Sequence, residues 1–200
     1  MLRIIAGEFG GRRIATPKGE ATRPTAEKVR GALFNMVENL MDLQGAVVLD
    51  LYAGSGALGL EALSRGATRC TFVEANARTA ALIRENAETL GARDRVQVTT
   101  ARVASWLGHA SPAEPATLIL ADPPYAAGEY EALFATLATW AGAADGAVIA
   151  VEAPAKMDVA LPSGLELTRV KRYGDTQLVI ARKGSGDQAA PATDPSHGET

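Results

Sequence analysis

The central part of the chain alternates short apolar runs with longer stretches in which apolar residues recur every three or four positions. The apolar runs are typical of buried strands and occupy residues 47–52, 70–74, 96–100, 117–121 and 147–152. Helical periodicity falls between them, at about residues 57–65, 76–90, 102–107 and 129–141. Because strands this apolar need cover on both faces, the alternation predicts a parallel sheet between two layers of helices.

Both ends of the chain depart from this alternation. Residues 165–173 and 176–182 are strand-like and are joined by a Gly174-Asp175 turn, which predicts an antiparallel hairpin. Near the N-terminus, residues 2–6 and 12–16 flank the turn "GEFGG" and predict a second, smaller hairpin, followed by an amphipathic helix from Thr25. We therefore expect an α/β sandwich with a mostly parallel sheet of seven strands, of which the seventh is antiparallel.

The length and composition favour one domain with short appendages. The chain has 200 residues, of which 47% are apolar and 22% charged, enough to fill a core. We divide it into a basic hairpin and linker at 1–24, the α/β domain at 25–183, and a disordered tail at 184–200 that has nothing to bury.

Several classes of protein are disfavoured by the composition. No apolar run approaches the ~20 residues that cross a bilayer, and the N-terminus lacks the apolar core of a secretory signal. The single cysteine, Cys70, excludes an internal disulfide and a cysteine-based metal cluster. We therefore expect a cytoplasmic protein with no membrane segment and no metal.

The net charge of −3 conceals an uneven distribution. Residues 1–30 contain seven Lys or Arg against three acids, a local charge of +4, so the rest of the chain carries −7. A basic segment on an acidic body indicates a polyanionic partner that is bound by one face. A solvated surface explains the same charges equally well.

A glycine-rich loop follows the first predicted strand of the sheet. Gly54, Gly56 and Gly59 form a GxGxxG pattern between this strand and the next helix, and Glu74 ends the following strand. In such loops the glycines let a nucleotide cofactor approach the helix N-terminus, and the acid binds the ribose. The pattern alone does not separate a nicotinamide dinucleotide from another adenosine cofactor.

Asp50 favours one of these cofactors. It lies at the end of the first strand, where we expect its carboxylate to face the loop. A negative charge there attracts the ammonium and sulfonium of S-adenosylmethionine and repels a pyrophosphate. A carboxylate that only orders the loop or caps the helix is the alternative interpretation.

The fourth strand ends in Asp122-Pro123-Pro124-Tyr125. Two prolines end the strand and stiffen the corner, which we expect at the ligand crevice along the carboxyl edge of the sheet. The exocyclic amine of a nucleobase is planar and weakly nucleophilic, and acceptors aimed at its hydrogens favour the tetrahedral geometry in which it attacks a methyl group. We expect the Asp122 carboxylate and the Pro123 carbonyl to be those acceptors. Tyr125 is then placed to stack on an extruded base.

These motifs resemble the amino-directed class of S-adenosylmethionine-dependent methyltransferases, whose fourth motif is Asp, Asn or Ser followed by Pro-Pro and an aromatic residue. The chain is more specifically similar to the RsmD family, through "RIIAGEFGGRRIATPKGEATRPT", "VLDLYAGSGALGLEAL" and "DPPY". The resemblance covers about residues 2–182. It implies a Rossmann-like class I methyltransferase sandwich that methylates the N2 amine of one guanine in bacterial 16S ribosomal RNA.

The resemblance also assigns roles to residues of this chain. It implies that S-adenosylmethionine is bound by Asp50, Tyr52, Gly54, Ser55, Gly56 and Glu74, and that Asp122, Pro123, Pro124 and Tyr125 serve the target base. We expect the 16S RNA, within an assembling or assembled small subunit, to be contacted through its phosphates by Arg12, Arg13, Lys18 and Arg23. Many relatives of this fold have an Asp or Asn near the adenine amine. This chain has Ala101 and Arg102 there, so we expect apolar contact from side chains such as Val103.

Other functions fit part of the pattern. Alternative acceptors are a DNA adenine or cytosine amine and a protein glutamine, although enzymes of the last kind usually have Asn before Pro-Pro and lack a basic start. A nicotinamide-dependent oxidoreductase fits the glycine loop but leaves residues 122–125 unexplained. A non-catalytic RNA-binding protein with this fold has no need of the complete set of motifs.

Overall fold

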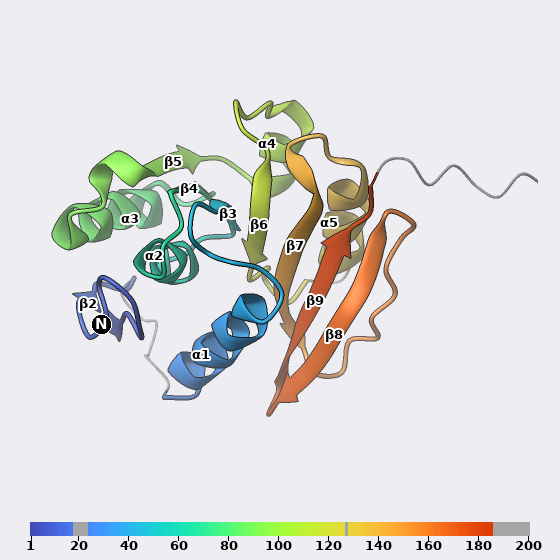
Figure 1. Cartoon of the computed structure of the whole chain (residues 1–200), viewed down its shortest axis with the longest axis horizontal. Helices are drawn as coiled ribbons and strands as arrows, with labels where there is room; N and C mark the ends of the chain where they lie inside the picture. Colours follow the sequence, from blue (N-terminus) through green and yellow to red (C-terminus); the bar gives the residue numbers. More distant parts are fainter. Residues whose placement is uncertain (18–23, 127, 186–200) are drawn as a thin grey trace, which may run out of the picture.

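The computed structural model describes residues 1–17, 24–126 and 128–185. Within this part of the chain the main sheet and its helices occur in the predicted order (Figure 1). The predicted tail beyond residue 185 lies outside the described residues, and so do Lys18 and Arg23, two of the predicted RNA contacts.

The bounds of the elements agree with the sequence pattern to within a few residues. The main sheet is formed by β3 Val47–Leu51, β4 Arg69–Glu74, β5 Val96–Thr100, β6 Ala116–Ala121, β7 Ala143–Pro154, β8 Leu165–Tyr173 and β9 Thr176–Lys183. The helices are α1 Pro24–Glu38, α2 Ala57–Ser64, α3 Ala77–Leu90, α4 Val103–His109 and α5 Glu129–Thr139, with the 3-10 turn η1 Arg93–Arg95. Local capping explains some ends: the Asn76 Oδ1 accepts the Arg78 and Thr79 N–H groups in the first turn of α3, and Gly91, at φ 74°, ends that helix.

The strand order of the sheet is β5-β4-β3-β6-β7-β9-β8. The strands from β3 to β7 pair in parallel, and β9 is antiparallel to both of its neighbours. The predicted sheet of seven strands with an antiparallel seventh strand is therefore confirmed. Because β3 and β6 are adjacent and the chain leaves them in opposite directions, their carboxyl ends form the switch point at which such sheets bind ligands.

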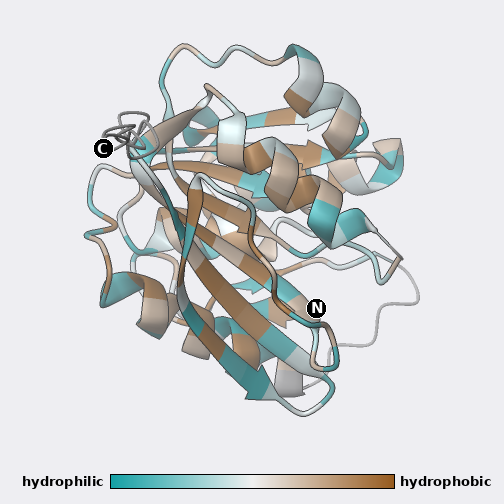
Figure 2. Cartoon of the chain, turned by 90° about the vertical axis from the view of Figure 1, so that its right-hand side faces the viewer, coloured by the Kyte–Doolittle hydropathy of each residue, from teal (hydrophilic) through white to brown (hydrophobic). Residues whose placement is uncertain are grey.

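Each face of the sheet has its own hydrophobic core. On one face, α1, α2 and α3 pack around Leu33, Phe34, Leu60 and Phe72; on the other, α4 and α5 pack around residues such as Ile119. Apolar residues run along the central strands, whereas loops and strand ends hold more of the hydrophilic residues (Figure 2). Residues that alternate along one strand therefore face different helix layers.

The N-terminal hairpin is shorter than the sequence predicts. Its strands are β1 Leu2–Arg3 and β2 Arg13–Ile14, where the pattern suggested five residues each. The ladder stops because amides of the predicted strands donate to side chains of the main domain instead: the Ala15 N–H donates to the Asn86 Oδ1 at 2.8 Å. Ile4, Phe9 and Ile14 are buried in the same core as α1 and α2, so the hairpin is part of the packed domain.

Gly7 lets the hairpin approach α2 closely. Its φ is +79°, and a Cβ at this position would lie 1.8 Å from the Ser64 carbonyl oxygen. In return, Ser64 binds the hairpin turn: its carbonyl accepts the Glu8 N–H at 2.7 Å, and its hydroxyl oxygen accepts the Phe9 N–H at 2.8 Å. Only glycine suits this position, for both its conformation and its space.

The fully buried Glu61 carboxylate on α2 holds three segments together. It accepts the N–H groups of Ile5 at 2.7 Å and Ala6 at 3.1 Å, and the Arg65 Nε at 2.9 Å. The Arg30 Nε on α1, also buried, lies 3.7 Å from it. Burial lowers the pKa of Arg30, and the charge of Glu61 opposes that effect. The hairpin, α1 and α2 therefore meet at one acid.

We expect Glu61→Gln to lower the free energy of unfolding by about 3 kcal/mol or more, because two largely buried guanidinium groups would then face a neutral amide. Urea denaturation followed by circular dichroism measures the change. The matched control is Glu38→Gln, which removes the more exposed carboxylate that lies 3.0 Å from Arg65. That change should cost less than about 1 kcal/mol. Equal losses in the two variants would contradict a central role for Glu61.

Candidate functional site

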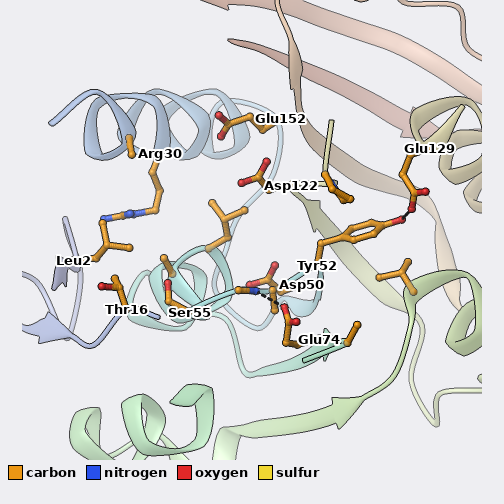
Figure 3. A pocket seen from close by; sticks show the side chains of 18 of the residues that line it. Leu2, Thr16, Arg30, Asp50, Tyr52, Ser55, Glu74, Asp122, Glu129 and Glu152 are labelled. Atoms are coloured by element: carbon orange, nitrogen blue, oxygen red, sulfur yellow. Dashed lines mark hydrogen bonds between the residues drawn. The ribbon is translucent and has the colours of Figure 1, made fainter. Parts of the chain in front are cut away.

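A cavity of about 1010 Å³ lies along the carboxyl ends of the central strands (Figure 3). Its walls come from the main sheet, from the loops that follow β3, β4 and β6, and from α1 and the N-terminal hairpin. Its lining includes seven of the predicted site residues: Asp50, Tyr52, Gly54, Ser55, Glu74, Asp122 and Pro124. The structure therefore brings the predicted cofactor loop and the Asp122 corner to one cavity.

Four carboxylates line this cavity from four neighbouring strands. Asp50, Glu74, Asp122 and Glu152 lie within two residues of the carboxyl ends of β3, β4, β6 and β7, respectively. The ladders end at Leu51↔Val73, Leu51↔Ala121 and Ala121↔Val151, which places Glu74, Asp122 and Glu152 on the next rung and Asp50 two residues below it. By the alternation of side chains, all four face the layer of α1 and α2. The cavity thus has an acidic floor.

The Asp50 carboxylate is buried and caps α2. Its Oδ2 accepts the backbone N–H of Gly59, in the first turn of that helix, at 2.8 Å, as a helix-capping acid would, and the side chain also lines the cavity. Burial raises the pKa of Asp50 well above its usual range; the Gly59 N–H opposes the shift, and the charges of Asp122 and Glu74 add to it. A bound cation would relieve this accumulation of negative charge.

Glu74 links the glycine loop to the start of α3. Its Oε2 accepts the Gly54 N–H at 2.9 Å, and its Oε1 accepts the Asn76 N–H at 2.7 Å. Gly54 has a φ of +54°, and a Cβ there would have only the Tyr52 carbonyl oxygen within 4.0 Å, so the loop leaves space on the cavity side. Gly56 does not line the cavity; it caps α2 and packs against Ile83.

The corner after β6 is fixed by a tyrosine that the sequence analysis did not identify. The buried hydroxyl of Tyr130, on α5, donates to the Pro123 carbonyl at 3.1 Å. Asp122 and Pro124 line the cavity, whereas the Tyr125 ring is 66% exposed and stands outside its lining. The corner therefore combines a carboxylate, an anchored carbonyl and an exposed aromatic ring.

Tyr52 closes another side of the cavity. It has a φ of 56°, rare for a residue with a side chain, and its hydroxyl donates to the Glu129 carboxylate at the start of α5. Burial, then the hydrogen bond and charge of Glu129, raise the pKa of Tyr52. This contact links the loop after β3 to the segment after the Asp122 corner.

Further lining residues were not predicted from the sequence. They include Leu2 and Thr16 of the hairpin segment, Arg30 of α1, Arg102 and Ala104 beside Val103, and the acids Glu129 and Glu152. Glu152 had a detectable signal, because it ends a predicted strand as Glu74 does. Arg30 had none, because an amphipathic helix gives no reason to single out one arginine. Val103, from which we expect apolar contact with the adenine, lies in the lining of the cavity.

Of the predicted RNA contacts, Arg12 already has partners within the protein. Its Nη1 donates to the Leu90 carbonyl at 2.9 Å, and its Nη2 donates to the Thr89 carbonyl, so its guanidinium caps the C-terminus of α3. Arg13 is exposed and borders a small hollow with Arg3 and Glu27. The other two predicted contacts, Lys18 and Arg23, lie outside the described residues.

The part of the chain that the structure describes contains neither a metal-binding cluster nor a membrane-spanning helix. In residues 1–17, 24–126 and 128–185, no group of three or more His, Cys, Asp or Glu side chains is arranged to hold a metal ion. Nor does any helix in these ranges have the length and hydropathy needed to cross a bilayer.

Comparisons with known proteins agree with this geometry. The family model described as "Conserved hypothetical protein 95" matches residues 2–182. The putative rRNA methyltransferase YlbH of Bacillus subtilis is 33% identical over 184 residues, which cover 91% of this chain and 99% of the relative. Ribosomal RNA small subunit methyltransferase D of Escherichia coli K12 is 33% identical over 191 residues, 94% of each chain.

Solved structures show the same fold. The putative methyltransferase yhhF from Escherichia coli matches with a TM-score of 0.80 and 33% identity, covering 92% of this chain and 98% of that one. A putative methylase from Haemophilus influenzae matches with a TM-score of 0.76 and 27% identity, covering 92% of this chain and 99% of that one.

The buried Asp50 generates a prediction about pH. Its pKa is raised on folding, so the folded protein holds this proton more tightly than the unfolded chain does. The stability gained from this tighter proton binding is fully present below the pKa of Asp50 in the unfolded chain, and it is lost as the pH rises through the pKa of Asp50 in the folded protein. Asp50→Asn keeps an acceptor for Gly59 but has no proton to lose. We therefore expect the free energy of unfolding of Asp50→Asn to exceed that of wild type by about 0.5–2 kcal/mol at neutral pH.

Guanidinium unfolding of the ligand-free proteins between about pH 4 and pH 8 measures this difference, which should be smallest at the acid end. Asp158→Asn changes an exposed acid outside the cavity and serves as the control. If the difference in the free energy of unfolding between Asp50→Asn and wild type became smaller with rising pH, burial would not disfavour the charge of Asp50.

Proposed function

This chain belongs to the RsmD family, and we propose that it transfers a methyl group from S-adenosylmethionine to the N2 amine of a guanine in 16S ribosomal RNA. The observation that supports the proposal most directly is that Asp122 lines the same cavity as Asp50 and Glu74. A target amine that binds at Asp122 and a cofactor that carries a reactive methyl group can therefore meet in this cavity. Such a substrate also agrees with a cytoplasmic location.

The residues of the cavity fit S-adenosylmethionine. When bound, this cofactor supplies an electrophilic methyl group on a sulfonium. Asp50 would attract its positive charges, and Glu74 would accept hydrogen bonds from the ribose hydroxyls. Val103 and Ala104 line the cavity beyond β5 and offer apolar contact to the adenine. A dinucleotide fits less well, because its pyrophosphate would face an acidic floor.

The corner after β6 would activate the target amine. The Asp122 carboxylate and the Pro123 carbonyl accept hydrogen bonds from the two amine hydrogens, which draws the nitrogen towards tetrahedral geometry. The Tyr130 hydroxyl occupies one lone pair of the Pro123 carbonyl and fixes its direction, which leaves the second lone pair for substrate. Orientation and electrostatics then supply most of the rate, with no strong base required.

The target base would reach this corner after leaving its stack. Tyr125, 66% exposed beside Asp122, offers an aromatic face on which an extruded base can stack. RNA phosphates cannot follow the base into an acidic cavity, so we place their contacts on the basic N-terminal segment, at Arg13, Lys18 and Arg23. Arg12 is left out of this set because it caps α3.

We expect Asp122→Ala to reduce the single-turnover methylation rate by about 10²-fold or more, the scale for a preorganised acceptor. Its affinity for S-adenosylhomocysteine, measured by calorimetry, should stay within a few-fold of wild type. Asp158→Ala removes an exposed acid outside the cavity and should leave both quantities unchanged. A nearly normal rate in the Asp122 variant would exclude this account of amine activation.

The RNA surface can be tested through salt dependence. Replacing Arg13, Lys18 and Arg23 by alanine should flatten the slope of log K against log salt for 16S RNA by about 2–3 units. Filter binding at several salt concentrations measures the slope. Arg12→Ala should instead lower stability and leave the slope nearly unchanged, since its guanidinium is bound to α3 carbonyls. A triple variant with the wild-type slope would place the RNA surface elsewhere.

The proposed reaction is tested by identifying the methylated nucleoside. The protein is incubated with labelled S-adenosylmethionine and free 16S RNA, assembled small subunits or duplex DNA, and the products are digested to nucleosides. We expect label in N2-methylguanosine, with more in assembled subunits, because one short basic segment is little surface to specify a single site in free RNA. Label in N6-methyladenine, in a cytosine product or only in DNA would refute the guanine assignment.

A further inference from the structure

Glu152 lies beside Asp122 in the cavity, and the amine activation described above does not use it. The parallel ladder between β6 and β7 pairs Ala121 with Val151, so the next residues, Asp122 and Glu152, occupy the same rung. Neighbouring strands are about 4.8 Å apart. Both side chains line the cavity on the face towards α1, and Figure 3 shows both carboxyl groups at its wall.

The Glu152 carboxylate is held at one oxygen. Its Oε1 lies 3.0 Å from the Thr176 hydroxyl on β9, which fixes the side chain against the sheet. Its Oε2 accepts no hydrogen bond from residues 1–17, 24–126 or 128–185. Burial raises the pKa of Glu152, as it does for an acid that has lost much of its water. An oxygen so placed favours a ligand that brings a hydrogen-bond donor.

A second group confirms that Glu152 and Asp122 are close to the same corner. The Tyr130 hydroxyl donates to the Pro123 carbonyl, and its pKa is raised by burial first and then by nearby charges that include Asp122 and Glu152. The Glu152 oxygen therefore stands near the acceptors that we assign to the target amine. A base held there would present to Glu152 an atom next to its amine.

Among purines, guanine matches two adjacent acceptors. Its N1 carries a hydrogen next to the N2 amine, so these two neighbouring positions both offer donors. In adenine, the ring nitrogen beside the amine is an acceptor, and a carboxylate facing it would repel its lone pair. A site with acceptors at both positions would therefore discriminate by hydrogen bonding, which rejects analogues more strongly than shape does.

We propose that Glu152 is a specificity-determining residue whose carboxylate accepts the N1–H of the guanine that presents its N2 amine to Asp122. This role rests on the proposed guanine-N2 chemistry and deepens it, because it names the group that distinguishes guanine from other purines. Thr176 is the positioning residue that holds Glu152 in place.

The test uses 2-aminopurine, which has the same 2-amine as guanine but no hydrogen on N1. The methylated guanine is first located in 16S RNA, and RNA carrying 2-aminopurine at that position is prepared by ligation and assembled into small subunits. Wild-type protein should methylate guanine with a kcat/KM at least about 10-fold above that for 2-aminopurine, the lower part of the range for one well-placed contact. Equal values would overturn the proposal without any variant.

Glu152→Gln provides the second measurement. Its amide N–H can donate to N1 of 2-aminopurine, so the preference for guanine should fall by about 10-fold or more. Affinity for S-adenosylhomocysteine should remain that of wild type. Glu131→Gln makes the same chemical change at an exposed position of α5 outside the cavity, and it should keep the wild-type preference. An unchanged preference in Glu152→Gln would show that its role is only structural.

The two proposals fail in different ways. Suppose that wild type methylates guanine N2 and yet shows no preference for guanine over 2-aminopurine, or shows a preference that Glu152→Gln does not change. In either case the proposed function stands and the role of Glu152 is refuted. If wild type places no label on guanine N2, both proposals are refuted.

Discussion

The buried carboxylate of Glu61 is the constraint on which the shape of the site depends. It binds two amides of the N-terminal hairpin, pairs with Arg65 of its own helix and lies 3.7 Å from Arg30 of α1. Buried ion pairs add little net stability compared with apolar packing, but they are costly to leave half-made, and so they favour one arrangement. This arrangement puts Leu2, Thr16 and Arg30 in the cavity wall.

The acids at the strand ends determine which parts of a ligand or substrate can enter the cavity and which parts must bind to the outer surface. Asp50, Glu74, Asp122 and Glu152 make the cavity floor negative, which suits a cationic cofactor and the donor edge of a neutral base. The same charge repels phosphates. In the proposed reaction, an RNA substrate would therefore be held from outside by cations such as Arg13, while a single extruded nucleobase enters. The separation of charge along the sequence thus becomes a separation in space.

Periodicity was sufficient to predict the sheet, because buried parallel strands and amphipathic helices are local patterns. It also located Asp50, Glu74 and Asp122, since strand ends meet at one edge. Contacts between distant segments were beyond its reach. Nothing in the sequence indicated that the guanidinium of Arg12, which we expected to contact RNA, binds carbonyls of α3. Nor did it indicate that the Glu61 carboxylate accepts the N–H of Ile5. The shortened hairpin strands have the same cause, because side chains of the main domain replace cross-strand partners.

Asp50 and Tyr52 show where the fold gives up stability for the site. Burial of Asp50 disfavours its charge, and the one hydrogen bond that its carboxylate accepts from the described residues comes from the Gly59 amide rather than from a cation. Tyr52 occupies a backbone region that disfavours side chains. A sequence selected for stability alone would have an apolar residue and a glycine at these positions. Such departures from local rules, at one edge of an otherwise regular sheet, are typical of a functional site, and a cationic ligand would supply the positive charge that Asp50 lacks.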